Sequence, residues 1–140
     1  MCRRTTVGVL VAACLLATPS ADADIIGSDG ADAIVGTDRS DELVGRGGRD
    51  LIRGLRGGDS LRGGAGADSI AAGPGADYVR GGQGRDYLEG GKGSDLLYGG
   101  RQADSVAGGT GNDLIAAGVP EMSSHQGAVG TSSAPTAEGT

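Results

Sequence analysis

An aspartate recurs every nine residues through most of this chain, without an insertion or a deletion. An aliphatic residue follows each of these aspartates two positions later. The ten periodic aspartates are Asp32, Asp41, Asp50, Asp59, Asp68, Asp77, Asp86, Asp95, Asp104 and Asp113. The aliphatic residues are Ile34, Leu43, Ile52, Leu61, Ile70, Val79, Leu88, Leu97, Val106 and Ile115. A fixed short period is typical of a solenoid, in which each unit packs only on its neighbours.

Glycine supplies the rest of the repeat. Of the 30 glycines, 25 lie between Gly27 and Ala116, and most precede an aspartate by two, four or five residues. The unit is therefore G-G-x-G-x-D-x-aliphatic-x, and its most regular copies run from Gly63 to Tyr98. Glycines let the backbone take positive φ and let neighbouring turns approach closely.

Nine residues per unit predict a six-residue turn followed by a three-residue strand. Side chains alternate in direction along a strand, so the aliphatic residue points inward, and neighbours such as Arg62 and Glu89 point outward. Two units complete a coil of 18 residues. Coils that stack at about 4.8 Å form two parallel sheets around a thin aliphatic core. We therefore expect an all-β fold.

Aspartates 18 residues apart lie above one another in this arrangement and form two columns of carboxylates. Each stacked pair costs about 1 to 3 kcal/mol if nothing neutralises it. A hard divalent cation removes this repulsion, and Ca²⁺ fits best because it accepts six to eight oxygen ligands at flexible angles. Zinc and copper lack ligands, since the only histidine is His125 near the C-terminus.

This repeat resembles the RTX family of hemolysin-type calcium-binding nonapeptide repeats, from Gly27 to Ala116. The resemblance implies a parallel β-roll, a right-handed β-solenoid of about ten nonapeptide turns, with Ca²⁺ held between turns two repeats apart. It also implies the metal ligands, which are the ten periodic aspartates and carbonyl oxygens of turn glycines. Those glycines are Gly64, Gly66, Gly73, Gly75, Gly82, Gly84, Gly91 and Gly93.

Some turns depart from the motif, and we expect them to bind more weakly. The first glycine is replaced by Ala72, the second by Ser28, Thr37, Arg46 and Leu55, and the fourth by Arg39 and Gln102. Asp29 and Asp38, in the third position, either add ligands or cap turns, and capping is the more common role of such residues.

The flanking segments predict a secreted, extracellular protein. Residues 1–23 have the form of a secretory signal peptide, with an apolar run from Val7 to Ala17 that is too short to span a membrane. Lipidation of Cys14 is an alternative fate for this segment. Residues 24–116 form the repeat domain, and residues 117–140, rich in Ser, Gly, Ala, Thr and Pro, are predicted to be disordered.

No nucleophile and base are paired in the sequence, so we expect no enzyme activity. A net charge of −6 argues against nucleic acid as a partner. The favoured function is a non-catalytic calcium-binding β-roll that folds when calcium binds. The alternative is a calcium-stabilised adhesion or matrix module that binds a cell-surface partner.

Two further hypotheses stay open: a detached fragment of a larger toxin or hydrolase, and an acidic chain without a fixed fold. The exposed edges of the end coils also leave end-to-end self-association open.

Overall fold

The computed structural model describes residue 22 and residues 24–118. The predicted signal peptide therefore lies outside the described residues except for Asp22, and the predicted disordered tail lies outside them except for Ala117 and Gly118. Within the described part of the chain, no helix is long and apolar enough to cross a membrane.

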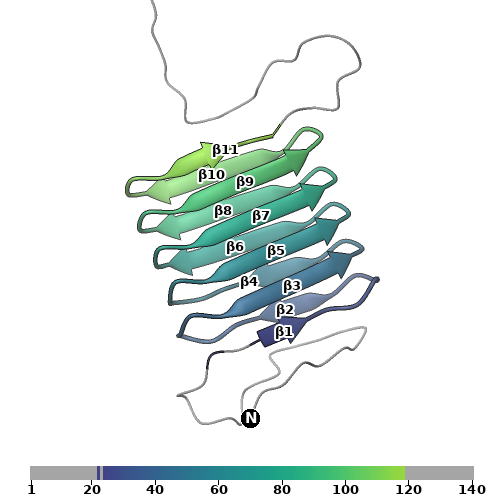
Figure 1. Cartoon of the computed structure of the whole chain (residues 1–140), viewed down its shortest axis with the longest axis horizontal. Coiled ribbons are helices and arrows are strands. Elements are labelled where there is room, and N and C mark those ends of the chain that lie inside the picture. The colour runs from purple at the N-terminus through teal and green to yellow at the C-terminus, as the bar shows by residue number, and fades with distance from the viewer. Residues whose placement is uncertain (1–21, 23, 119–140) are drawn as a thin grey trace, which may run out of the picture.

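The described residues form eleven β-strands, which Figure 1 shows stacked in two layers. The strands are β1 (Asp24–Ile26), β2 (Ala33–Val35), β3 (Glu42–Gly47), β4 (Leu51–Arg53), β5 (Ser60–Ala65), β6 (Ser69–Pro74), β7 (Tyr78–Gln83), β8 (Tyr87–Lys92), β9 (Leu96–Arg101), β10 (Ser105–Thr110) and β11 (Leu114–Ala116).

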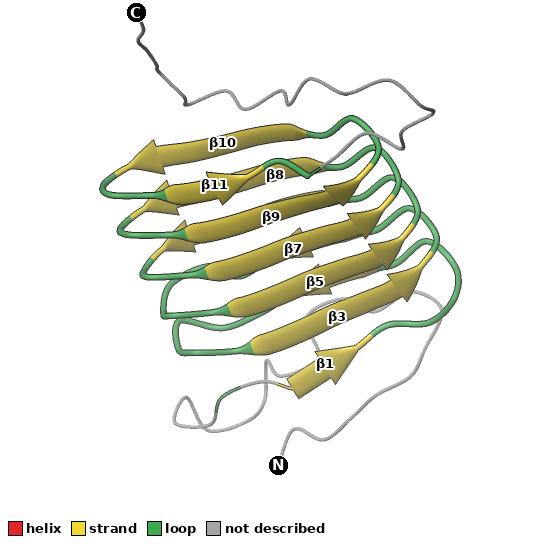
Figure 2. Cartoon of the chain, turned by 45° about the horizontal axis from the view of Figure 1, so that its top comes forward, coloured by secondary structure: helices red, strands yellow, loops and turns green. Residues whose placement is uncertain are grey.

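Odd and even strands form separate sheets, so the chain alternates between them (Figures 1 and 2). One sheet has the order β1-β3-β5-β7-β9-β11, and the other has the order β10-β8-β6-β4-β2. All pairs are parallel, and each residue pairs with residues 18 positions away, as Leu61 does with Leu43 and Val79. The fold is therefore the expected all-β parallel solenoid.

The figure of about ten nonapeptide turns is not supported as a number of coils, because the solenoid has about five, in agreement with the expected two units per coil. One nine-residue unit contributes one strand and one bend, which is half a coil. The chain needs two units to return to the same sheet.

Most strands are also longer than the three residues that the period predicted. Strand β5, for example, has six residues and continues through Gly63 and Gly64 of the next unit. The pairing register between β5 and β7 joins Arg62 to Arg80 and Gly64 to Gly82, and it omits Gly63 between them. In the six-residue strands, the first residue of the next unit is thus part of the strand although it has no partner in the register, whereas Gly27, Gly36 and Gly54 lie outside the strands.

The core is a column of aliphatic side chains between the two sheets. The periodic aliphatic residues from Ile34 to Val106 are buried, as expected, and Ile115 is half-buried because it lies in the last strand. Ile25 is also buried, although no aspartate marks its unit, since Ala23 stands nine residues before Asp32. Ala117 completes the core at the other end.

Candidate calcium sites in the turns

The periodic aspartates lie in the turns, where eight of them, from Asp32 to Asp95, are at most 4% exposed. They are buried because the turns of neighbouring coils stack directly on them. Each of these eight backbone N–H groups donates to Oδ1 of the aspartate 18 residues later, at 2.7 to 3.0 Å. The Asp50 N–H, for example, donates to Asp68 Oδ1 at 2.9 Å. One oxygen of each acceptor carboxylate therefore holds the preceding coil in place.

The second carboxylate oxygen has no such partner in most turns. Seven buried Oδ2 atoms accept no hydrogen bond, and they belong to Asp50, Asp59, Asp68, Asp77, Asp86, Asp95 and Asp104. An unsatisfied buried polar group costs about 1 to 3 kcal/mol, and more if it is charged. Seven such oxygens in one small domain indicate that something other than the protein chain satisfies them.

Burial raises the pKa of these carboxyl groups. Desolvation is the largest cause and lifts the pKa of Asp50 from 3.8 to about 6, and that of Asp59 to about 7. Hydrogen bonds from the backbone oppose the rise, whereas the charges of the neighbouring aspartates in the column add to it. The pKa values of Asp77 and Asp86 rise to about 6 for the same main reason.

A first-position glycine lies close to six of these seven oxygens, whereas the unit of Asp77 has Ala72 at that position. A methyl group on Gly90 would lie 2.5 Å from Asp95 Oδ2 and 2.6 Å from the carbonyl oxygen of Gly108, in the next coil. A carboxylate oxygen and a carbonyl oxygen thus face the same space. The first-position glycines with this arrangement are Gly27, Gly36, Gly45, Gly54, Gly63, Gly81, Gly90 and Gly99.

A carboxylate oxygen without a donor and a carbonyl oxygen that lies close to it form the kind of oxygen set that a hard cation accepts. No group of three or more His, Cys, Asp or Glu side chains that could hold a metal occurs in residues 22 and 24–118. A cation in these turns would therefore take most of its ligands from backbone carbonyls and only one or two from carboxylates. This balance suits Ca²⁺ and excludes sites that need nitrogen or sulfur ligands.

The glycines predicted as ligands share a turn conformation. All eight have positive φ, between 113° and 158°. The carbonyl oxygens of Gly64 and Gly66 point along the stack toward Gly82 and Gly84, where a side chain would collide with them. A side chain at Gly82 or Gly84 would therefore prevent these turns from stacking, whether or not each carbonyl binds metal.

The first-position residues were not named by sequence analysis. Their carbonyl oxygens, such as those of Gly81 and Gly108, lie beside Asp68 Oδ2 and Asp95 Oδ2. The sequence feature that could have indicated these carbonyl oxygens is the first glycine of the motif, five residues before the aspartate. Only Ala72 breaks this rule, and its side chain is buried in the hydrophobic core.

The first coil is closed differently. The Ser28 N–H donates to Asp32 Oδ2 at 2.5 Å, and the Ser28 hydroxyl lies 3.0 Å from the same oxygen. Thr37 contacts Asp41 in the same way, with its N–H 2.5 Å from Oδ2. The Oδ2 atoms of Asp32 and Asp41 therefore accept hydrogen bonds from the protein and do not belong to the seven unsatisfied ones.

Three of the other replacements keep the positive φ of the glycine that they replace. Arg46 and Leu55, in the second position, have φ of 89° and 87°, and Gln102, in the fourth, has φ of 76°. Asp29 lies 4.0 Å from Arg46 Nε, so its carboxylate faces an arginine. The last periodic aspartate, Asp113, is half-buried in the final coil.

Residues 26–61, 53–88 and 80–115 match the family described as the RTX calcium-binding nonapeptide repeat, whose pattern comprises 4 copies of the unit. The chain belongs to this RTX family. RTX nonapeptide repeats bind Ca²⁺, which agrees with the oxygen ligands in the turns. No curated protein and no solved structure shows a significant match to this RTX chain.

Proposed function

We propose that this chain is a secreted, non-catalytic RTX protein whose β-roll folds when Ca²⁺ binds outside the cell. The observation that carries the proposal is the set of seven buried Oδ2 atoms without a hydrogen-bond donor. In the absence of metal these oxygens oppose folding, and with metal they become ligands. The stability of the roll then depends on the calcium concentration.

The proposed ligands are the seven unsatisfied aspartates together with the carbonyl oxygens of first-position residues and turn glycines. Asp113 is a weaker candidate because no described coil follows it. Asp32 and Asp41 are also weaker candidates, because Ser28 and Thr37 already satisfy their Oδ2 atoms. Each site that sees calcium at ten times its dissociation constant adds about 1.4 kcal/mol to the stability of the folded state. Several such sites turn a marginal roll into a stable one.

The composition of the N-terminal segment supports the secretion part of the proposal. The segment 1–23 has the composition of a signal peptide, and a chain that meets calcium only after export stays unfolded while it crosses the membrane. Extracellular calcium modules bind with dissociation constants of about 0.1 to 1 mM, which suits sites built from few carboxylates.

The test is far-ultraviolet circular dichroism of residues 24–140 during a calcium titration from chelator to about 10 mM. We expect a cooperative gain of β-signal with Ca²⁺ and none with Mg²⁺ at the same concentration. A spectrum that does not respond to calcium would overturn the proposal.

A calcium-stabilised adhesion or matrix module is the second candidate. The observation that favours it is a row of exposed arginines on one face of the roll, including Arg62 and Arg80. Such a face has no role in calcium binding.

A further inference from the structure

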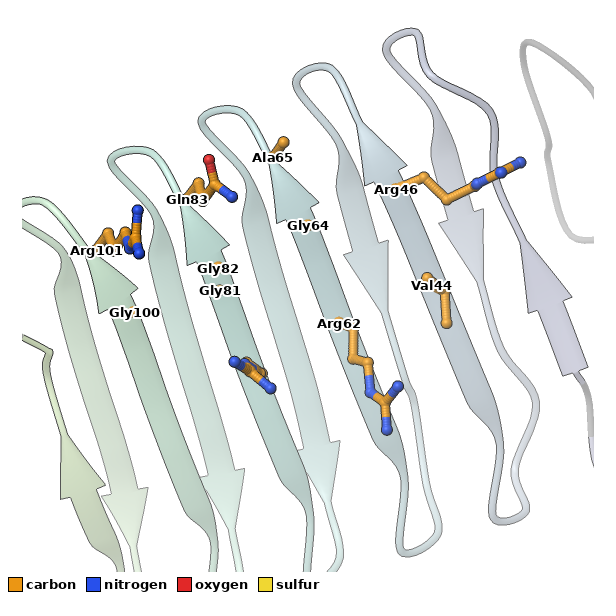
Figure 3. A pocket seen from close by; sticks show the side chains of 11 residues that line it. Val44, Arg46, Arg62, Gly64, Ala65, Gly81, Gly82, Gln83, Gly100 and Arg101 are labelled. Atoms are coloured by element: carbon orange, nitrogen blue, oxygen red, sulfur yellow. The ribbon is translucent and has the colours of Figure 1, made fainter.

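A groove crosses the outer face of the sheet that contains β3, β5, β7 and β9 (Figure 3). It has a volume of about 690 Å³ and runs across these four strands, which corresponds to a length of about 14 Å at the usual strand spacing. Its floor contains Gly64, Gly82 and Gly100, which lack side chains and leave the groove open.

Arginines lie on both sides of this glycine floor. Arg62 and Arg80 are paired in register on one side, and Arg101 lies on the other, beside Gln83 of the neighbouring strand. Arg46 lies at the end nearest the N-terminus, as Figure 3 shows. Among the residues that the structure describes, none that lines the groove is acidic.

Most of these arginines lack an acidic partner. Arg62, Arg80 and Arg101 are exposed and form no ion pair with any residue that the structure describes. Charge balance within an acidic roll would place arginines beside the aspartates, yet these carboxylates are buried in the turns and the arginines lie on a sheet face. The groove is therefore a local cationic surface on a chain of net charge −6.

Two tyrosines extend this surface toward the C-terminus. Tyr98 follows Arg62 and Arg80 in the same register, and its ring centroid lies 5.8 Å from that of Tyr78. Both tyrosines line an adjoining hollow that shares Arg80 and Gly100 with the arginine groove. Tyrosine offers an apolar ring face together with a polar hydroxyl.

We propose that this surface, the arginine groove with Tyr78 and Tyr98, binds a linear acidic polysaccharide. Guanidinium groups recognise carboxylates through paired hydrogen bonds, and tyrosine rings provide flat partners for sugar rings. The elongated, open shape suits a chain rather than a compact molecule. Nucleic acid is disfavoured, because proteins that bind it are usually basic overall, whereas this chain has a pI of about 4.6.

The inference rests on the proposed calcium-dependent folding, since the groove exists only when neighbouring coils are stacked. The opposite sheet offers a matched control residue. Arg53 in β4 occupies the same position of its unit as Arg62 and is also exposed, but it lies beside Asp38 in a smaller hollow of about 330 Å³. Replacing it by glutamine removes one arginine from the other face.

The experiment measures the binding of a fluorescent oligogalacturonate to the purified chain in saturating calcium, by anisotropy. We expect the wild type and R53Q to bind equally, R62Q/R80Q to bind at least about tenfold more weakly because two charge-assisted contacts are lost, and a neutral maltooligosaccharide not to bind. Binding should also weaken as salt rises.

Equal binding by R62Q/R80Q and R53Q would overturn the inference, because it would place the ligand elsewhere or attribute binding to calcium bridges. Tighter binding of single-stranded DNA than of oligogalacturonate would overturn it as well. Circular dichroism of each sample separates the two proposals. A folded chain that does not bind the oligosaccharide refutes only the proposed binding at the groove. A chain that calcium fails to fold refutes calcium-dependent folding, and binding is then measured in an osmolyte that folds the chain.

Discussion

Replacing Asp68 by asparagine should stabilise the metal-free roll and weaken its response to calcium. Asp68 is 2% exposed, and its Oδ1 accepts the Asp50 N–H at 2.9 Å. This hydrogen bond fixes the orientation of an asparagine in its place, because only the amide oxygen can accept from Asp50. The amide nitrogen then takes the position of the unsatisfied Oδ2, in the space that the Gly81 carbonyl also faces.

The magnitude follows from what the substitution removes. An unsatisfied buried acceptor disappears, which is worth about 1 to 3 kcal/mol to the metal-free state. The charge of Asp68, which raises the pKa of Asp50 and Asp86, disappears as well. Calcium in turn loses a carboxylate ligand, and the loss of one site at ten times its dissociation constant lowers the stability of the calcium form by about 1.4 kcal/mol.

Two titrations followed by circular dichroism measure these opposite effects. In chelator, D68N should fold at a lower concentration of trimethylamine N-oxide than the wild type, since this osmolyte favours burial. Without osmolyte, D68N should need more calcium to fold. A variant that merely damaged the fold would shift both midpoints upward, and that result would refute the proposed role of Oδ2.

Asp32 provides the control. Its Oδ2 already accepts hydrogen bonds from the N–H and hydroxyl of Ser28. D32N therefore removes satisfied hydrogen bonds rather than an unsatisfied charge, and it should make folding in chelator more difficult.

Three other outcomes are expected. Burial raises the pKa of Asp59 from 3.8 to about 7, so between these pH values the metal-free folded state binds more protons than the unfolded state and loses stability as the pH rises. In chelator, the β-signal should therefore increase as the pH is lowered from about 7.5 to about 5. A constant signal would contradict this. S28A/T37V should lower the free energy of unfolding by about 1 kcal/mol for each hydroxyl hydrogen bond that is lost, as measured by chemical unfolding, and should leave the stability added by calcium unchanged. If calcium added less stability to this variant, these turns would be calcium sites. G63A places a methyl group 2.8 Å from the Gly81 carbonyl oxygen and should raise the calcium midpoint, at a cost of about 1 to 3 kcal/mol in stability. The control G47A, whose methyl group has no contact nearer than 3.6 Å, should change the midpoint little. Equal effects of the two variants would refute the role of the space beside Gly63.

The period of the sequence was sufficient to predict the core and the two aspartate columns, because both depend only on which residues lie 9 and 18 positions apart. It was insufficient to predict how each turn is closed. Ser28 and Leu55 occupy the same position of the motif, yet the Ser28 hydroxyl binds Asp32, whereas Leu55 takes positive φ. That difference depends on a hydrogen bond available to one side chain and not to the other.

Other features were missed for equally local reasons. Ile25 was not predicted to lie in the core, because its unit has Ala23 where the other units have the periodic aspartate. The length of the strands was underestimated because glycine usually weakens a strand, whereas here the turns of adjacent coils hold it extended. The figure of about ten turns counted the nine-residue repeat of the sequence, which is half the 18-residue repeat of the structure.

This mismatch between the two repeats constrains how such a chain can change in length. Loss of one nine-residue unit would leave every later aliphatic residue in the core, since each unit supplies its own. It would nevertheless move all later outward residues to the opposite sheet, so that loss of a unit between Arg62 and Arg80 would place Arg80 on the face of Arg53 and no longer beside Arg62. Selection for stability alone would tolerate duplications of nine residues, whereas selection for a surface would keep only steps of 18. A strict parity of unit number among related chains would therefore be a record of selection on their outer faces.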